Sequence, residues 1–223
     1  MARWGQDFSF NFYLPAKSNC DDCDRIAAGC GPVAIGMLLR YHEFPVMNMS
    51  FNGQTAFTDC ANMPRFAGGC SNNTVGFRSS AMLIRIAGNV MSSDYGGVFG
   101  CETATYPANI GDGLDFFGYS HDGKGKLSDR FFDVQNDLEN QIPVIFSGAT
   151  SPVGNNWHIW LADGFQQTSY EQCHNNVCSY YSYSSWSMNW GQHGDGNGWY
   201  STSPNSIDEY DELLRVYTNI RPI

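Results

Sequence analysis

A cysteine between two glycines is the residue of this sequence best placed to do chemistry. In the stretch GCGPVAIGMLLRY, Cys30 directly precedes an apolar run with helical spacing. The start of a helix favours the thiolate form, because free backbone N–H groups and the helix dipole lower the pKa of a thiol there. The flanking Gly29 and Gly31 would let a substrate strand approach closely. The pattern therefore predicts a nucleophile, whereas the ordinary fate of a lone cysteine is an inert, buried thiol.

A thiol nucleophile needs a general base, and His158 is the histidine that best meets this need. It opens the apolar segment HIWLAD after a turn-rich loop that contains Gly154, which predicts a place at the mouth of a central strand. His42 follows Cys30 on the same predicted helix by 12 residues. At about 1.5 Å per residue it lies about 18 Å away, too far to touch the thiol. The other histidines lie in polar or glycine-rich segments, and the next candidate among them is His193.

Three further residues complete a catalytic set. In SMNWGQHG, Asn189 could hold the imidazole of His158 through its side chain or its backbone, and Trp190 could shield that contact from water. Gln6 offers a side-chain N–H that could join the backbone N–H of Cys30 in an oxyanion hole. Taken alone, Gln6 is an ordinary surface amide and Trp190 an ordinary core aromatic. The inference depends on the order Gln, Cys, His, Asn along the chain.

Eight cysteines in 223 residues indicate an oxidising compartment, where disulfides persist. Their close spacing favours three local disulfides: Cys20 with Cys23, Cys60 with Cys70, and Cys173 with Cys178 across a predicted hairpin turn. The alternative for Cys20-x2-Cys23 is half of a zinc site. The chain has no second CxxC and no histidine pair with finger spacing, so neither a metal nor another cofactor is expected. Local pairing would leave Cys30 and Cys101 as free thiols.

Composition and charge exclude several classes of protein. Hydrophobic residues make up 42% of the chain and aromatic residues 15%, as in a globular protein. Acidic residues outnumber basic ones by 22 to 12, which argues against nucleic acid and anionic membranes as partners. No apolar run is long enough to enter a membrane as a span, and the first residues lack the apolar core of a signal peptide. We expect a monomer that is secreted, periplasmic or at the cell surface, with its upstream segments trimmed.

The elements that must position these residues fall into two groups. Helices are predicted over residues 29–44 and 74–91, from residue 107, and from residue 128. After residue 143 the pattern changes to strands: VIFSG, HIWLADGF, a hairpin around HNNV, GWYST and LLRVYTNI. Helices followed by strands predict an α+β fold. We expect one domain over 1–223, with a helical subdomain over 20–140 and a β subdomain over 141–223 that includes the N-terminal segment.

These motifs together resemble the streptopain family of bacterial papain-like cysteine peptidases. GCGPVAIGMLLRYHEFP is similar to the family's nucleophile helix, and DYGGVFG and LDFFGYS to its mid-chain segments. NQIPVIFSG is similar to the strand before the histidine, MNWG…DGNGWY to the segment after it, and YTNIRP to the last strand. The resemblance covers nearly the whole chain. It implies a papain-like fold, in which a helical half packs against an antiparallel sheet or barrel.

The resemblance also implies an activity. It makes Cys30 the nucleophile, His158 the base and Gln6 the oxyanion donor of a secreted endopeptidase that cuts peptides and proteins. The chemistry runs through a thiolate–imidazolium pair and an acyl-enzyme. It further implies a precursor inhibited by its own pro-segment. Two alternatives stay open: a papain-fold amidase or leader peptidase, and a non-catalytic binding domain.

The sequence departs from the family beside the base. Trp157 stands directly before His158, where the family more often has a small residue. A large indole at this position is expected to narrow the substrate cleft. Segment 201–212 also lacks the glycine-rich loop of streptopain.

Overall fold

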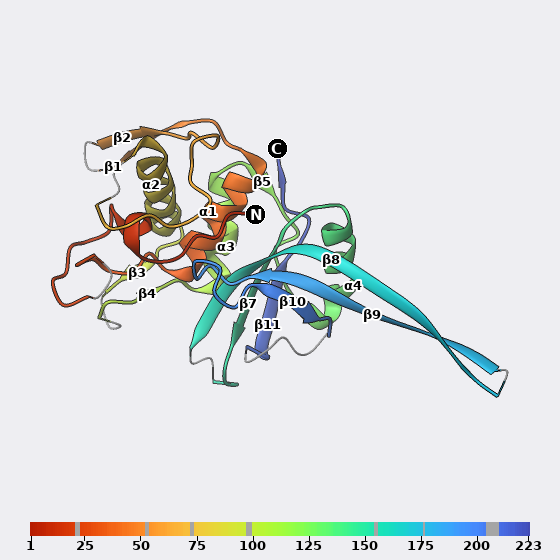
Figure 1. Ribbon diagram of the computed structural model, residues 1–223. Coiled ribbons are helices and arrows are strands. Elements are labelled where there is room, and N and C mark those ends of the chain that lie inside the picture. The colour runs from red at the N-terminus through yellow and green to blue at the C-terminus, as the bar shows by residue number, and fades with distance from the viewer. Residues whose placement is uncertain are drawn as a thin grey trace.

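The computed structural model describes the chain except for residues 21–22, 52–53, 72–73, 97–99, 154–155, 176 and 204–209. Gly154 and the middle of the DYGGVFG segment therefore lie outside the described residues. Helices α1 (Cys30–His42), α2 (Val75–Val90) and α3 (Ile110–Phe116) gather on one side of the molecule (Figure 1). The main sheet lies on the other side together with α4 (Leu127–Glu139), and a two-stranded arm projects from the sheet. This is the α+β architecture that the sequence predicted.

The helical half is built around one buried helix. Its helices are α1, α2 and α3. Gly36 lets α1 approach its neighbours closely, because a Cβ there would lie 3.0 Å from the side chains of Ile84 and Trp4. The core of this half also contains Phe10, Val33, Leu38, Met82 and Leu114. Packing on nearly every side fixes α1, and with it the position of its first residue, Cys30.

The other half is a six-stranded antiparallel sheet in the order β10-β9-β8-β7-β11-β6. Its strands are β6 (Lys124–Lys126), β7 (Val144–Ala149), β8 (Trp157–His174), β9 (Val177–Asn189), β10 (Gly198–Ser201) and β11 (Glu212–Tyr217). Helix α4 packs against this sheet. The second core joins residues of the helix to Val144, Phe146, Trp160 and Trp186. Residues 127–139 thus pack with the sheet, although they fall in the stretch that the sequence assigned to the helical half.

The remaining elements are short. The paired strands are β1 (Asn48–Phe51) with β2 (Gln54–Phe57), β3 (Asp94–Tyr95) with β4 (Thr103–Ala104), and β5 (Tyr119–Ser120) with β12 (Arg221–Pro222). Two 3-10 turns are η1 (Phe8–Asn11) and η2 (Pro107–Asn109). No helix in the described part of the chain is long and apolar enough to cross a membrane.

The disulfides only partly follow the spacing of the cysteines. The structure joins Cys173 to Cys178, as expected, but it joins Cys20 to Cys101 and Cys23 to Cys70. The predicted pairs Cys20–Cys23 and Cys60–Cys70 were therefore wrong, and Cys60 is a buried free thiol. The folded path decides the pairing, because it brings the Cα atoms of Cys20 and Cys101 to 5.5 Å across 81 residues of sequence. Since both cysteines of the CxxC are in disulfides, that motif is no zinc half-site.

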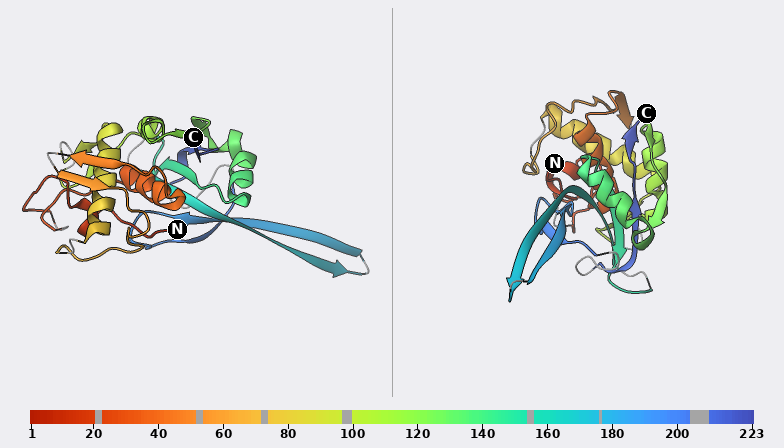
Figure 2. Two further views of the ribbon diagram at one scale, coloured as in Figure 1. Left: turned by 90° about the horizontal axis from the view of Figure 1, so that it is seen from above. Right: turned by 90° about the vertical axis from the view of Figure 1, so that its right-hand side faces the viewer.

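Strands β8 and β9 continue together beyond the sheet and form the arm (Figures 1 and 2). The sequence predicted separate strands at 158–165 and 167–173, whereas β8 is one strand of 18 residues. The same strand therefore starts at the candidate base and ends at the tip of the arm.

Candidate active site

Cys30 is the first residue of α1, as the sequence predicted. The preceding Gly29 has φ +89°, a conformation that favours glycine and turns the chain into the helix. A Cβ on Gly29 would lie 2.8 Å from the side chain of Thr103, and one on Gly31 would lie 2.9 Å from Thr105. On the Cβ side, both glycines therefore make room for these threonines. The sequence led us to expect that these glycines let a substrate strand approach the thiol closely.

The thiol of Cys30 lies where the two halves meet. Burial raises its pKa to about 11, from an ordinary value of 9.0. Hydrogen bonds from the backbone of Ile159 and Gly31 act in the opposite direction, and the charge of Glu102 adds to the rise. Ile159 follows His158 in β8, so this contact brings the start of the strand to the start of the helix.

His158 is buried, with 4% of its surface exposed, and pairs with Gly148 across β7 and β8. Its Nε2 lies 2.8 Å from the carbonyl oxygen of Trp190. A carbonyl can only accept a hydrogen bond, so Nε2 carries the proton and Nδ1 is the basic nitrogen of the neutral ring. Burial lowers the pKa of His158, and the bond to Trp190 offsets part of this effect.

Both pKa shifts favour uncharged groups in this conformation. The raised pKa of Cys30 favours the thiol, and the lowered pKa of His158 favours the neutral imidazole. The sequence led us to expect a resting thiolate–imidazolium pair. The difference arises because desolvation is the largest influence on each group, larger than the backbone hydrogen bonds that oppose it.

Asn189 does not hold the imidazole. Its Nδ2 donates to the carbonyl of Ala2 at 2.8 Å, and its Oδ1 accepts the N–H of Gly191 at 3.4 Å. The side chain thus fixes the N-terminal segment beside the end of β9. The expectation that it orients His158 was wrong, because the neighbouring carbonyl of Trp190 takes that place.

Three aromatic rings surround His158. Its ring centroid lies 5.9 Å from Trp160, 5.9 Å from Trp190 and 5.2 Å from Tyr210. Trp190 is itself fixed, since its indole N–H donates to the hydroxyl of Tyr200 at 3.1 Å. Sequence reasoning missed Tyr210, because a single tyrosine in the polar run SIDEYDE carries no signal of a buried neighbour.

Gln6 lies beside the turn that leads to the thiol. The backbone N–H of Ala28, two residues before Cys30, donates to the backbone carbonyl of Gln6 at 2.6 Å. The neighbouring Asp7 is hydrogen-bonded to His193, whose backbone N–H donates to the carbonyl of Trp4 at 3.0 Å. His193 therefore joins the loop after β9 to the N-terminal segment.

Trp157 is the first residue of β8 and is 39% exposed. It pairs with Ala149 at the end of β7. An exposed indole directly before a buried histidine is consistent with a place at the rim of a cleft.

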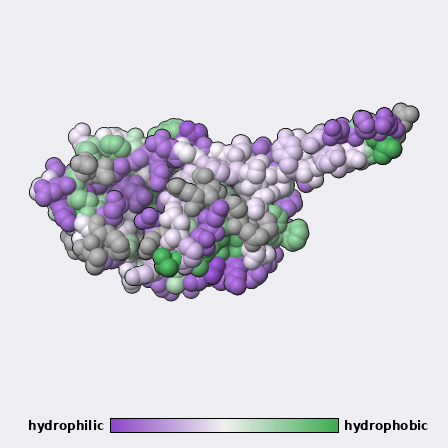
Figure 3. All heavy atoms as spheres, turned by 90° about the horizontal axis from the view of Figure 1, so that it is seen from below, coloured by the Kyte–Doolittle hydropathy of each residue, from purple (hydrophilic) through white to green (hydrophobic). Residues whose placement is uncertain are grey.

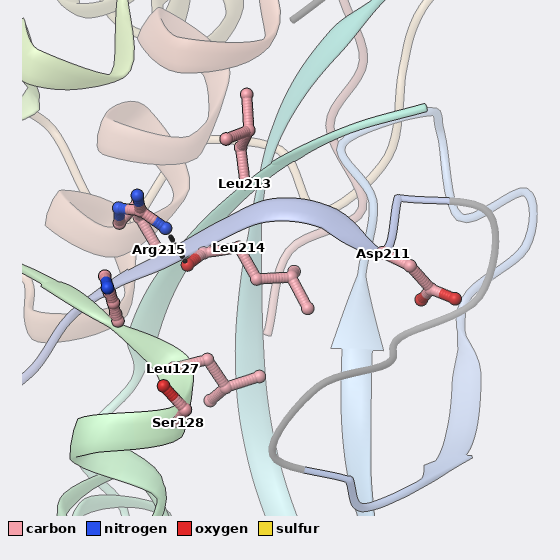
Figure 4. A pocket seen from close by; sticks show the side chains of 7 residues that line it. Leu127, Ser128, Asp211, Leu213, Leu214 and Arg215 are labelled. Carbon is pink, nitrogen blue, oxygen red and sulfur yellow. Dashed lines mark hydrogen bonds between the residues drawn. The ribbon is translucent and has the colours of Figure 1, made fainter. Parts of the chain in front are cut away.

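Two cavities in the described part of the chain are not lined by this pair. One of about 220 Å³ lies between the start of α4 and β11, lined by Leu127, Ser128 and Asp211 among others (Figure 4). A second, of about 280 Å³, is lined by Met1, Asp163, Asn189 and Trp199 among others. Neither is lined by Cys30 or His158.

Among the described residues, one group of potential metal ligands was found, at the tip of the arm. It consists of Glu171, Cys173 and Cys178. Since both sulfurs are in a disulfide, a single carboxylate remains, which is too few ligands for a metal site.

Comparisons with known proteins agree with this geometry. A family model described as the peptidase C10 family matches residues 4–200. An active interpain A cysteine protease of Prevotella intermedia has a similar structure, with a TM-score of 0.69 and 20% identity. That match covers 100% of this chain and 92% of interpain A. A prointerpain A fragment from the same organism, with alanine replacing a cysteine, gives a TM-score of 0.66 at 20% identity. That match covers 100% of this chain and 70% of the fragment. A search of curated proteins finds no match.

Proposed function

Because the chain belongs to the peptidase C10 family, the streptopain family, and is a cysteine peptidase with a papain-like fold, we propose that Cys30 and His158 carry its catalysis. The observation that supports this assignment most directly is the contact between the thiol of Cys30 and the backbone of Ile159, the neighbour of His158. We further propose that it is an exported endopeptidase, made as a precursor that its own pro-segment inhibits.

The proposed reaction begins with proton transfer from Sγ of Cys30 to Nδ1 of His158. The sulfur attacks the peptide carbonyl carbon, and the imidazolium then gives its proton to the leaving amine as the C–N bond breaks. Water attacks the resulting thioester, His158 takes up its proton, and the acid product leaves while the thiol is restored. The backbone hydrogen bonds from Ile159 and Gly31 stabilise the thiolate when it forms.

Two groups would stabilise the oxyanion of each tetrahedral intermediate. The backbone N–H of Cys30, which has no partner within the helix at the start of α1, is the proposed first donor, and the side-chain amide of Gln6 is the proposed second. The carbonyl of Trp190 keeps the imidazole in the tautomer that leaves Nδ1 basic. Trp157 and the glycines beside the thiol, Gly29 and Gly31, are proposed to border the cleft.

The assignment is tested with Cys30→Ala and a matched control, Cys60→Ala. Both remove a free thiol, but Cys60 is buried in the helical core, away from the site. We expect Cys30→Ala to abolish cleavage of a fluorogenic peptide and labelling by an epoxide, while the folded circular dichroism spectrum stays. Cys60→Ala should keep both activities. Peptide cleavage that survives in Cys30→Ala would overturn the assignment, and hydrolysis confined to simple amides would favour the amidase alternative.

A further inference from the structure

The arm exposes surface that the peptidase site does not use. We define the arm as residues 166–185, in which β8 and β9 leave the sheet after the pair Gln166–Ser185, where Ser185 still pairs with Ser201 of β10. A two-stranded hairpin alone is marginally stable, and its unpaired edges are a hazard for aggregation. No residue of the arm that the structure describes belongs to either hydrophobic core. A binding role would explain why the protein keeps such an exposed arm.

One face of the arm is lined with tyrosines. Side chains alternate between the two faces of a ribbon, and directly paired residues share a face. Tyr170 pairs with Tyr181, and Thr168 pairs with Tyr183. These three tyrosines, which we call the tyrosine face, are 49%, 47% and 57% exposed. Tyr180 points to the opposite face, where its pair Glu171 is also its hydrogen-bond partner.

The arm is held in shape before any partner binds. The rings of Tyr170 and Tyr181 stack with centroids 5.4 Å apart. The Cys173–Cys178 disulfide closes the tip. Rigid tyrosines lose little conformational entropy on binding, and the serines between them offer adaptable hydrogen bonds, as in antibody binding sites. This composition favours a protein partner. Because the stacked pair covers one face of each ring, it offers less flat ring surface for a sugar.

The charge of the arm differs from that of the whole chain. The molecule has a net charge of −10, yet the sequence QQTSYEQCHNNVCSYYSYSS contains one acidic residue, Glu171, and no lysine or arginine. The arm is correspondingly pale in the hydropathy view, with strong colours near its tip (Figure 3). Glu171 lies on the face opposite the tyrosine face, which carries no acidic residue, lysine or arginine, so binding to that face should change little with salt.

We propose that the tyrosine face is an exosite for protein substrates. The inference rests on the proposed function, since β8 connects the arm to the candidate base: it begins with Trp157 and His158 and continues into the arm. From His158 to Cys173 the strand spans about 50 Å at about 3.3 Å per residue. A protein can bind the arm and still place a flexible segment in the cleft, whereas a short peptide cannot reach both.

The test removes the tyrosine face and leaves the cleft intact. The variant carries Tyr170→Ser, Tyr181→Ser and Tyr183→Ser, and the matched control is Tyr180→Ser on the opposite face. A second variant replaces residues 168–183 with Asn-Gly, which can close a two-residue hairpin turn between the paired residues Gln167 and Ser184. Each protein is assayed with casein and with a fluorogenic peptide of about eight residues.

We expect kcat/KM for casein to fall about tenfold or more in the triple variant and in the shortened variant, the size of effect of losing binding hot spots. The peptide should be cleaved as before, and Tyr180→Ser should change neither value. In a Cys30→Ala background, the Kd for casein should rise by a similar factor and keep its value in about 0.5 M NaCl.

Other outcomes overturn the inference. Casein cleavage that stays unchanged in the triple and shortened variants does so. An equal fall in kcat/KM for casein and for the peptide does so too, because it would make the arm a structural support. A parent dimer that the triple variant converts to monomers would assign the face to a second copy. Binding of dextran without casein would assign it to a glycan. If the parent cleaves neither casein nor peptide, the proposed function fails instead.

Discussion

At the scale of single residues, desolvation controls the chemistry of the site. Burial raises the pKa of Cys30 and lowers that of His158, so both shifts favour the neutral pair. The proton count of the pair matters more than where the proton rests. A neutral pair and an ion pair hold the same number of protons, and the active form is the one with a single proton on the thiol and Nδ1 together.

This proton count predicts a broad bell for kcat/KM against pH. Activity is lost on the acid side when His158 gains a second proton, and its lowered pKa places that loss below pH 6.5. Activity is lost on the alkaline side when the remaining proton leaves, and the raised pKa of Cys30 moves that loss above pH 9.0, toward about 11. Peptide cleavage measured from pH 4 to 11 checks both limits. An acid limb above pH 6.5 would contradict the prediction.

Tyr210 is predicted to position and shield the imidazole. Its ring lies 5.2 Å from that of His158, and it also packs on Trp160 and Trp190. Tyr210→Ala should let water reach His158, so that its pKa rises toward 6.5 and the acid limb moves to higher pH. Loss of an aromatic pair, about 0.5–1.5 kcal/mol, corresponds to a fall of about 2- to 10-fold in kcat/KM.

Tyr210→Phe is the control, because it keeps the ring and removes only the hydroxyl. It should retain the parent pH profile. An acid limb that stays in place in Tyr210→Ala would show that the ring does not shield His158, even if activity fell.

At the scale of elements, the disulfides hold the segments that carry Cys30. The carbonyl of Cys101 accepts the N–H of Ala27 at 2.8 Å, and Cys101 is bonded to Cys20. The Cys20–Cys101 disulfide closes a loop across 81 residues of sequence, whereas the Cys173–Cys178 disulfide spans 5 residues. Constraint of the unfolded chain grows with loop length, so the two bonds should differ in what they contribute to stability.

Replacing both Cys20 and Cys101 by serine should lower the free energy of unfolding by about 4 kcal/mol, and replacing Cys173 and Cys178 by about 2 kcal/mol. Denaturant titrations measure both values. The first variant should also lose peptidase activity, since the turn before Cys30 loses its anchor. Equal stability losses would argue against loop length as the cause.

At the scale of the whole molecule, the arm dominates the shape. The body is built on two cores that meet where α1 contacts β8, and the arm extends well beyond it (Figure 2). An elongated monomer has more friction with solvent than a compact one of the same mass. We expect sedimentation equilibrium to give 24.8 kDa, the mass of one chain.

Sedimentation velocity should give a raised frictional ratio for the parent. The variant shortened at residues 168–183 should return to the value of a compact protein. A measured mass near twice that of one chain would contradict the prediction of a monomer.

Much of the fold was predictable from the sequence because local patterns determine it. The apolar spacing after Gly29 and the proline at position 45 predict both ends of α1 to within a few residues. The apolar run VIFSG predicts most of β7. The position of Cys30 at a helix start and of His158 near a strand start followed from the same patterns. These features depend on neighbours in sequence, whose side chains share a face at fixed intervals.

The tertiary structure alone decided the contacts between distant segments. Trp190 orients His158 through its backbone carbonyl. Every residue carries such a carbonyl, so the type of side chain at position 190 could not predict this hydrogen bond. Asn189 instead reaches Ala2, and Cys20 pairs with Cys101 rather than with its neighbour. The direction of both pKa shifts likewise depends on burial, and therefore on how the two halves pack. Sequence patterns therefore indicated the residues that we propose for the chemistry, while packing determined their partners and the tautomer of the imidazole.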